Sequence, residues 1–245
     1  MEVKKNKIFT NILAIFIIFL LWHIASKLLG YGFLPDPIWV LKNTSEIFLQ
    51  ELGLHIAYSL FRILAGISIS LVLGLTIGLF MGRCNGIDRI LSPFVYLIYP
   101  IPKIAFLPLV MLLCGLGEMA KITMIVLIVV FQIIVAARDA AKSLPIEKFW
   151  GVRSLGASRG TILRRVILPG SLPGILSGLR ISLGTALSVL FFTETFGTTY
   201  GLGYYIMDSW NRVNYVDMFS GIVTLAVVGF LLFFLTDLAA KKSYH

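Results

Sequence analysis

The sequence of 245 residues is 58% hydrophobic and only 13% charged, which excludes a water-soluble domain because such a domain needs more polar residues to cover its core. Its net charge of +9 would suit a nucleic-acid-binding protein, but the basic residues are distributed like those of a membrane protein. A bilayer tolerates only helices or closed barrels, and the strict alternation of a barrel strand is absent. The predicted fold class is therefore an all-α polytopic membrane protein.

Six stretches are apolar and long enough to cross a bilayer, which takes about 20 helical residues. The first follows the basic start MEVKKNK, but its apolar run of about 22 residues exceeds the roughly 7–15 of a secretory signal peptide, so we expect a retained helix. We predict about six transmembrane helices in all. Their approximate ranges are 8–30, 58–82, 91–114, 119–137, 173–196 and 218–238.

The positions of lysine and arginine predict the orientation of these spans. If there are six crossings, fourteen of the 21 basic residues lie at the two termini or in loops on that same side of the membrane. The opposite loops contain only Lys42 and Arg212, and five more basic residues lie within spans. Because loops rich in Lys and Arg stay in the cytoplasm, we expect both termini on the cytoplasmic side of the cell inner or plasma membrane.

The stretch after the first span predicts a short outer helix. Ile38, Leu41 and Ile47 follow a proline-punctuated start, at a spacing typical of an amphipathic helix at the membrane interface. We therefore divide the chain into an N-terminal transmembrane helix with an outer interfacial segment, 1–50, and a core, 51–240.

Glycines recur at four-residue intervals in two spans. Gly74, Gly78 and Gly82 lie in the second span, and Gly174 and Gly178 lie in the fifth. Small residues at this spacing let membrane helices approach closely, so we expect both faces to form tight helix–helix contacts.

The third span contains three prolines and a lysine. Pro100, Pro102 and Pro108 each remove a helix hydrogen bond, which predicts a broken helix. Irregular backbone at membrane depth is tolerated only where protein buries it or where it lines a cavity. Lys103 at that depth must face protein or water, which makes it a functional candidate. Alternatively, the helix begins later and Lys103 reaches the cytoplasmic edge.

Glu194 ends the fifth span, within FFTETFGTTYGLGYY, and is the one carboxylate inside a span apart from terminal ones. Two interpretations are open: a functional carboxylate in the interior, or an interfacial residue solvated outside. The glycines of GLGYY then end the helix before a further outer segment.

Catalytic and metal-binding patterns are absent from the sequence. His23, His55 and His245 are too far apart in the predicted topology to bind zinc together. Cys84 and Cys114 are separated by about 45 Å of helix and cannot form a disulfide. GLGEMAKIT lacks the spacing of a phosphate-binding P-loop. We expect no catalytic residue, metal or cofactor in this chain; if it works by ATP, a separate subunit binds the nucleotide.

The longest cytoplasmic segment, 138–172, is basic and contains several glycines. Pro145 marks the start of a short helix and Gly156 marks its end. Exposed aromatic residues beside arginines suit docking into the groove of a partner, and a helix that lies on anionic lipid is the alternative. The residues that this helix would display are Phe149, Trp150, Val152 and Leu155, with Lys148 and Arg153 beside them.

The segment LGASRGTILRRVILPGSLPGILSGLR closely resembles the EAA loop of permeases of binding-protein-dependent ABC importers. The family pattern is a short helix, a glycine and, about nine residues later, I/V-x-L-P, represented here by Gly156 and Ile167–Pro169. HIAYSLFRILAG, YPIPKIAFLPLVMLLCGLGEMAKI and YGLGYYI are similar to the nitrate/sulfonate/taurine branch, so the resemblance covers roughly 50–240. In one departure, Trp150-Gly151-Val152 replaces Glu-Ala-Ala and removes the glutamate that pairs with the ATPase in the family.

The resemblance implies a type I ABC importer permease fold and a transport function, with no enzymatic activity. Two permease chains, expected to be identical, would form the translocation pathway, and two ATPase subunits would bind their coupling helices. An extracytoplasmic binding protein would deliver a sulfonate, taurine, nitrate or thiamine-precursor-like solute. An ion-coupled carrier or channel and a membrane-embedded lipid enzyme are the alternatives, and co-purification with an ATPase distinguishes the importer from both.

The residues assigned to ATPase docking are Phe149, Trp150, Gly151, Val152, Arg153, Leu155, Gly156, Ala157 and Pro169. Those assigned to the translocation pathway are Pro100, Pro102, Lys103, Pro108 and Glu194.

Overall fold

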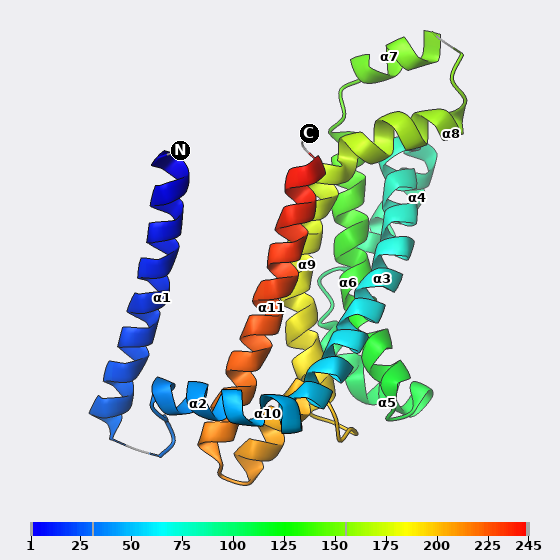
Figure 1. Ribbon diagram of the computed structural model, residues 1–245. Helices are drawn as coiled ribbons and strands as arrows, with labels where there is room; N and C mark the ends of the chain where they lie inside the picture. The colour runs from blue at the N-terminus through cyan, green and yellow to red at the C-terminus, as the bar shows by residue number, and fades with distance from the viewer. Residues whose placement is uncertain (1, 31, 155, 244–245) are drawn as a thin grey trace.

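The computed structural model describes residues 2–30, 32–154 and 156–243, with side chains described outside 2–9, 11, 153, 242 and 243. Over these residues the chain consists of helices and short connections, so the all-α prediction is confirmed (Figure 1). The elements in chain order are α1 (Glu2–Leu29), α2 (Pro37–Ile47), η1 (Phe48–Leu52), α3 (Gly53–Arg83), α4 (Asn85–Ile98), η2 (Lys103–Phe106), α5 (Leu107–Cys114), α6 (Glu118–Lys142), α7 (Glu147–Ser154), α8 (Arg159–Ile162), η3 (Leu163–Ile167), α9 (Leu168–Glu194), α10 (Leu202–Asn211) and α11 (Tyr215–Ser243).

The membrane spans agree with the predicted ones. Within the described residues, five helices are long and apolar enough to cross a membrane. A sixth span consists of two helical pieces, α4 and the continuous segment of η2 and α5, if these pieces, which are bent by 79° to each other, are counted as one span. Figure 1 shows the start of α1 and the end of α11 at the end of the bundle that carries α7 and α8. The helices α2 and α10 lie at the opposite end. We call these two ends the α7 end and the α10 end.

The centre of the bundle is α6, which packs between α3 and α9. The predicted glycine faces form these contacts. A Cβ on Gly74 would lie 2.7 Å from the Cβ of Ile133, and a Cβ on Gly174 would lie 2.7 Å from the Cβ of Ala140. Any larger side chain would push the helices apart, so the predicted close packing is confirmed.

The predicted outer helix is α2, and it is held against α11 at the α10 end. Nδ2 of Asn43 donates a hydrogen bond to Oδ1 of Asp217 at 2.8 Å. Asp36 caps the first turn of α2 by accepting the N–H of Ile38 at 2.9 Å, and this hydrogen bond lowers the pKa of Asp36. Figure 1 shows α1 standing apart from the bundle over much of its length. Near the α10 end it meets α11, where the ring centres of Trp22 and Phe219 are 5.6 Å apart.

Candidate functional site

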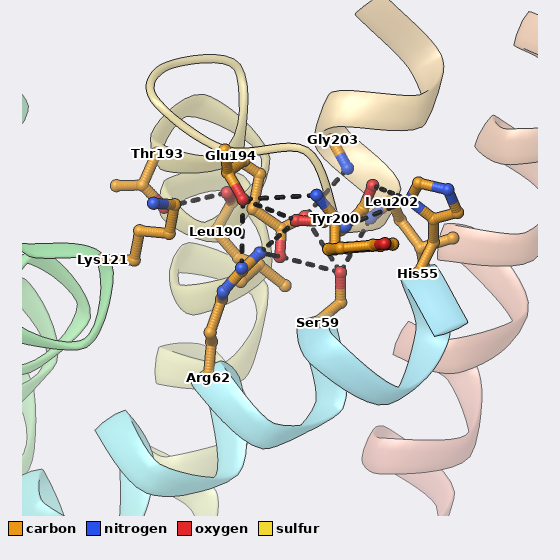
Figure 2. Close-up of polar contacts among 12 residues, drawn as sticks. His55, Ser59, Arg62, Lys121, Leu190, Thr193, Glu194, Tyr200, Leu202 and Gly203 are labelled. Atoms are coloured by element: carbon orange, nitrogen blue, oxygen red, sulfur yellow. Dashed lines mark hydrogen bonds and ion pairs between the residues drawn. The ribbon is translucent and has the colours of Figure 1, made fainter. Parts of the chain in front are cut away.

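Three charged side chains meet inside the α10 end of the bundle. Arg62 of α3 is fully buried, and its Nη1 donates at 2.8 Å to Oε1 of Glu194, which is also fully buried (Figure 2). Nε and Nη2 of Arg62 donate to the two carboxylate oxygens of Glu118, each at 2.6 Å. Bidentate pairing of this kind is the strong form of an arginine–carboxylate contact. Because Glu118 begins α6 and Glu194 ends α9, Arg62 joins three spans.

Glu194 also caps α10. Its Oε2 accepts the N–H of Gly203 at 2.8 Å, and its two oxygens accept the hydroxyl of Ser59 at 2.8 and 2.9 Å. Ser59 in turn accepts the N–H of Leu202 at 2.8 Å. Negative charge at a helix N-terminus is stabilised by the peptide dipoles. The interpretation of Glu194 as a solvated interfacial residue is therefore wrong, because its side chain is 0% exposed.

The segment that precedes α10 is fixed by the same contacts. Gly201 has a φ of +130°, and a Cβ there would collide with the carboxyl of Glu194 and the guanidinium of Arg62. Its N–H donates to Nδ1 of His55 at 3.1 Å, and Nη1 of Arg62 donates to the carbonyl oxygen of Tyr200 at 2.7 Å. Only glycine fits at this position, which explains the first glycine of GLGYY.

A second buried cation, Lys121, connects segments at the α10 end. Lys121 of α6 is 0% exposed, and its Nζ donates to the carbonyl oxygens of Leu116, Gly117 and Gly197 at 2.7, 3.3 and 3.3 Å. Gly197 lies between α9 and α10, so Lys121 holds this connection against the start of α6. We call the following residues the polar network: Ser59, Arg62, Glu118, Lys121 and Glu194.

The predicted break in the third span lies between α4 and η2 and is confirmed. Helix α4 ends at Ile98, and Pro100 and Pro102 lie in the connection that follows. Pro108 has a different place, in the first turn of α5, where a missing N–H costs no intrahelical hydrogen bond. It therefore begins a helix instead of breaking one.

Lys103 follows the break, and its side chain turns back toward it. The residue is 7% exposed, and its Nζ donates to the carbonyl oxygens of Ile98 and Tyr99 at 2.9 and 3.1 Å. Nζ also lies 4.7 Å from the centre of the Phe131 ring. The ammonium group ends inside the protein, so the alternative in which it reaches the cytoplasmic edge does not hold.

A cavity of about 350 Å³ lies between the broken segment Tyr99–Ile104, α6 and α9. It is at mid-depth of the bundle, because Gln132 of its lining stands near the middle of α6. Within the cavity wall, Nε2 of Gln132 on α6 donates a hydrogen bond to Oγ1 of Thr185 on α9 at 3.1 Å. Glu194 is not part of the lining, so the cavity and the polar network are separate features. The lining residues with a polar side-chain group are Tyr99, Lys103, Gln132, Thr185 and Ser188.

The short helix predicted in the longest loop is α7, but one of the residues predicted to be exposed on it, Phe149, is buried. Phe149 is 1% exposed and packs into an apolar cluster beneath α7, with the guanidinium carbon of Arg83 3.8 Å from its ring centre. The prediction that Phe149 is displayed is wrong, because this ring gains more by burial against α3 than by exposure. The next residue, Trp150, is 60% exposed, and Gly151 is exposed beside it.

The rest of the loop follows the predicted pattern. Gly156 has a φ of +74°, which suits a glycine that terminates a helix. Val152 and Ala157 are partly buried against the cluster that contains Phe149, and Pro169 stands in the first turn of α9. Two predicted features lie outside the described part of the chain: Leu155 and the side chain of Arg153.

Comparison with known proteins identifies the family. Residues 70–243 match the family described as the binding-protein-dependent transport system inner membrane component. The chain belongs to this family. It is 34% identical over 218 residues to the taurine transport system permease protein TauC of Escherichia coli K12, covering 86% of this chain and 79% of TauC. It is 31% identical over 216 residues to the putative aliphatic sulfonates transport permease protein SsuC of Bacillus subtilis 168, covering 87% of this chain and 78% of SsuC.

The fold of this permease agrees with that assignment. An inward-facing structure of the MetNI methionine ABC transporter matches it with a TM-score of 0.68 at 24% identity, covering 78% of this chain and 95% of the other. The type I ABC importer fold and the resemblance to the nitrate/sulfonate/taurine branch are thereby confirmed. The protein is a multi-pass inner-membrane permease of an ABC importer, and its family is one of transport and not of catalysis.

Sequence reasoning missed Arg62 of the permease, Glu118 and Lys121; of the charged residues in the polar network it named Glu194 alone. A signal was present, because a lone arginine in an apolar span is costly in a bilayer and needs a partner. Glu118 was assigned to an outer loop and Lys121 to the start of the fourth span, so neither was considered as a buried charge. A search for opposite charges at the same end of neighbouring spans would have paired Arg62 with Glu194.

Proposed function

We propose that two identical copies of this permease form the translocation pathway of an ATP-driven importer, with 138–172 as the loop that receives force from the ATPase. The observation that carries this proposal is the two-sided structure of α7. Trp150 faces outward, free to enter a groove of a partner, while Phe149 packs inward under Arg83. A partner that moves Trp150 therefore also moves the end of α3. The nucleotide belongs to the separate ATPase subunit, and we expect no cofactor in this chain.

Helix α3 offers a route for that movement across the membrane. Arg83 is in its last turn and Arg62 is in its third turn, about 32 Å away at 1.5 Å per residue. Displacement of the Arg83 end would shift Arg62 and, through it, the carboxylate of Glu194 that caps α10. In this proposal the pathway core is 51–240, and the unit 1–50 lies beside it.

The orientation follows from charge. The α7 end carries both termini and the basic loops, so we place it in the cytoplasm, next to the ATPase. The α10 end then faces the extracytoplasmic binding protein. The polar network would hold this receiving surface in one conformation until the movement of α3 releases it.

The proposed cargo is a small solute that carries a sulfonate group. The support comes from TauC and SsuC, whose names assign them taurine and aliphatic sulfonates. Nitrate-like and thiamine-precursor-like solutes are the further candidates within the same branch. We place the pathway along the broken third span, at Pro100, Pro102, Lys103 and Pro108. Glu194, which is buried in the polar network, would act at its outer end by capping α10 and would not line it.

Purification of the permease from its own membranes tests this function. We expect an ATPase subunit to co-purify with the wild-type chain and to be lost from Trp150→Asp, because a carboxylate would be buried unpaired in the groove that receives the tryptophan. Trp39→Asp is the matched control: this tryptophan is 72% exposed on α2, at the opposite end, and its loss should leave the ATPase bound. Solute uptake by the purified chain alone, without ATP, would instead establish the carrier or channel alternative.

A further inference from the structure

The position of Lys103 is created by the helix break. Pro100 and Pro102 end α4, so its last carbonyl groups lose their usual helical partners, and the carbonyl oxygen of Ile98 accepts the N–H of Ile101 at 3.2 Å in the turn that follows. Nζ of Lys103 binds two of them, on Ile98 and Tyr99, and the negative end of the α4 dipole favours a cation there. The fold therefore holds an ammonium group at mid-depth of the bundle, where a charge is otherwise costly.

Among the side chains that the structure describes, three cations are buried, Arg62, Lys103 and Lys121, and they differ in how their charge is balanced. The guanidinium of Arg62 is paired with two carboxylates. Lys121 lies close to these carboxylates and binds three carbonyl groups away from the cavity. Among the residues that the structure describes, no carboxylate pairs with Lys103, and its side chain lines the cavity. An anion in the cavity would balance this charge.

A second polar group in the same wall has an unused hydrogen-bonding position. Oε1 of Gln132 is buried and has no hydrogen-bond partner among the described residues, while the other end of the amide binds Thr185. The two ends of a glutamine amide exchange by rotation, so the unused end presents either an acceptor or a donor. A buried polar group without a partner is unfavourable. Because Oε1 is itself buried, a ligand in the cavity bonds to it, and removes this cost, when the Gln132 side chain turns toward the cavity.

We propose that this cavity is a binding site for one small organic oxyanion of the sulfonate class, in which Lys103 binds the charged group and Gln132 binds a polar substituent or a further oxygen. The inference rests on the proposed transport function and adds a permease site that selects cargo independently of the binding protein. The cavity is open on one side, and its volume of about 350 Å³, at the small end for ligand pockets, suits a small solute. The remaining wall, which includes Ile104, Val189 and Phe192, is apolar and suits a short aliphatic chain.

Equilibrium binding to the purified permease–ATPase complex, without nucleotide or binding protein, tests the site. The probes are radiolabelled taurine and methanesulfonate, with ethylene glycol as an uncharged competitor. We expect both sulfonates, zwitterionic taurine and anionic methanesulfonate, to bind at one site per permease chain and the glycol not to compete. Lys103→Met should weaken binding by about tenfold or more, since a charge-assisted contact is lost, and Lys103→Arg should restore part of it. Gln132→Leu should weaken taurine binding more than methanesulfonate binding.

The matched control is Lys121→Met, which makes the same substitution at a buried lysine outside the cavity. It should leave anion binding unchanged in every preparation that elutes as an intact complex on size exclusion. The inference is overturned if the wild-type complex binds neither probe, if Lys103→Met binds them as wild type does, or if Lys121→Met lowers affinity as much. Each of these results leaves the transport function intact as long as the ATPase co-purifies and its hydrolysis is stimulated by the loaded binding protein. Loss of that stimulation in the wild type would refute the proposed function itself.

Discussion

Removal of Arg62 is the most direct test of the polar network. In Arg62→Met, Glu194 keeps its bonds to Ser59 and Gly203 but loses its cation while it remains 0% exposed. Glu118 is less affected because its side chain is 38% exposed and reaches solvent. Breaking a buried ion pair by removing one partner costs about 3–5 kcal/mol. For a chain of this size, that corresponds to a fall in Tm of roughly 6–20 °C.

A second substitution separates the lost charge from the lost packing. Glu194→Gln removes the negative charge and keeps an oxygen that accepts the N–H of Gly203. If the unpaired carboxylate causes the loss in Arg62→Met, the double variant Arg62→Met/Glu194→Gln should recover at least half of it, and the two substitutions will be non-additive.

The assay is thermal unfolding of the purified permease in lipid nanodiscs, followed by tryptophan fluorescence. Arg180→Met is the matched control, because it breaks an ion pair with Asp237 in which the two side chains are 57% and 40% exposed. Such a pair contributes about 0–1 kcal/mol, so its loss should move Tm little. The reasoning fails if Arg62→Met is as stable as Arg180→Met, or if the double variant is less stable than Arg62→Met alone.

Two further predictions concern the α10 end and the orientation. Gly201→Ala should lower Tm and expose the segment before α10 to added protease, because its backbone is left-handed and its Cβ meets Glu194; Gly86→Ala, in open space, should do neither. In intact cells carrying a cysteine-free variant, an impermeant thiol reagent should label cysteines placed at Thr44 or Arg212 and spare one at Arg159. Labelling at Arg159 would overturn the six-span orientation.

The spans, the glycine contacts and the helix break could be predicted because each depends on local sequence. A run of about 20 apolar residues specifies a membrane helix wherever it packs. Gly74 and Gly174 indicate close packing through their spacing alone, although the sequence does not name α6 as the shared partner. Pro100 and Pro102 break a helix in any surroundings. Pro108 would do so only in the interior of an α-helix, and here it stands in the first turn of α5, directly after the short helix η2.

The orientation of single side chains could not be predicted in the same way, because it depends on contacts between segments far apart in the sequence. Nothing within Glu147–Ser154 distinguishes Phe149 from Trp150 as the buried ring; the distinction comes from Arg83 on α3, which stacks on one and not on the other. Glu194 likewise is ambiguous by itself. Its burial is possible only because Arg62, 132 positions away, supplies the opposite charge and Ser59 and Gly203 supply hydrogen bonds. A charge in an apolar span therefore indicates from the sequence that a partner exists, and only the packing of the helices decides which residue it is.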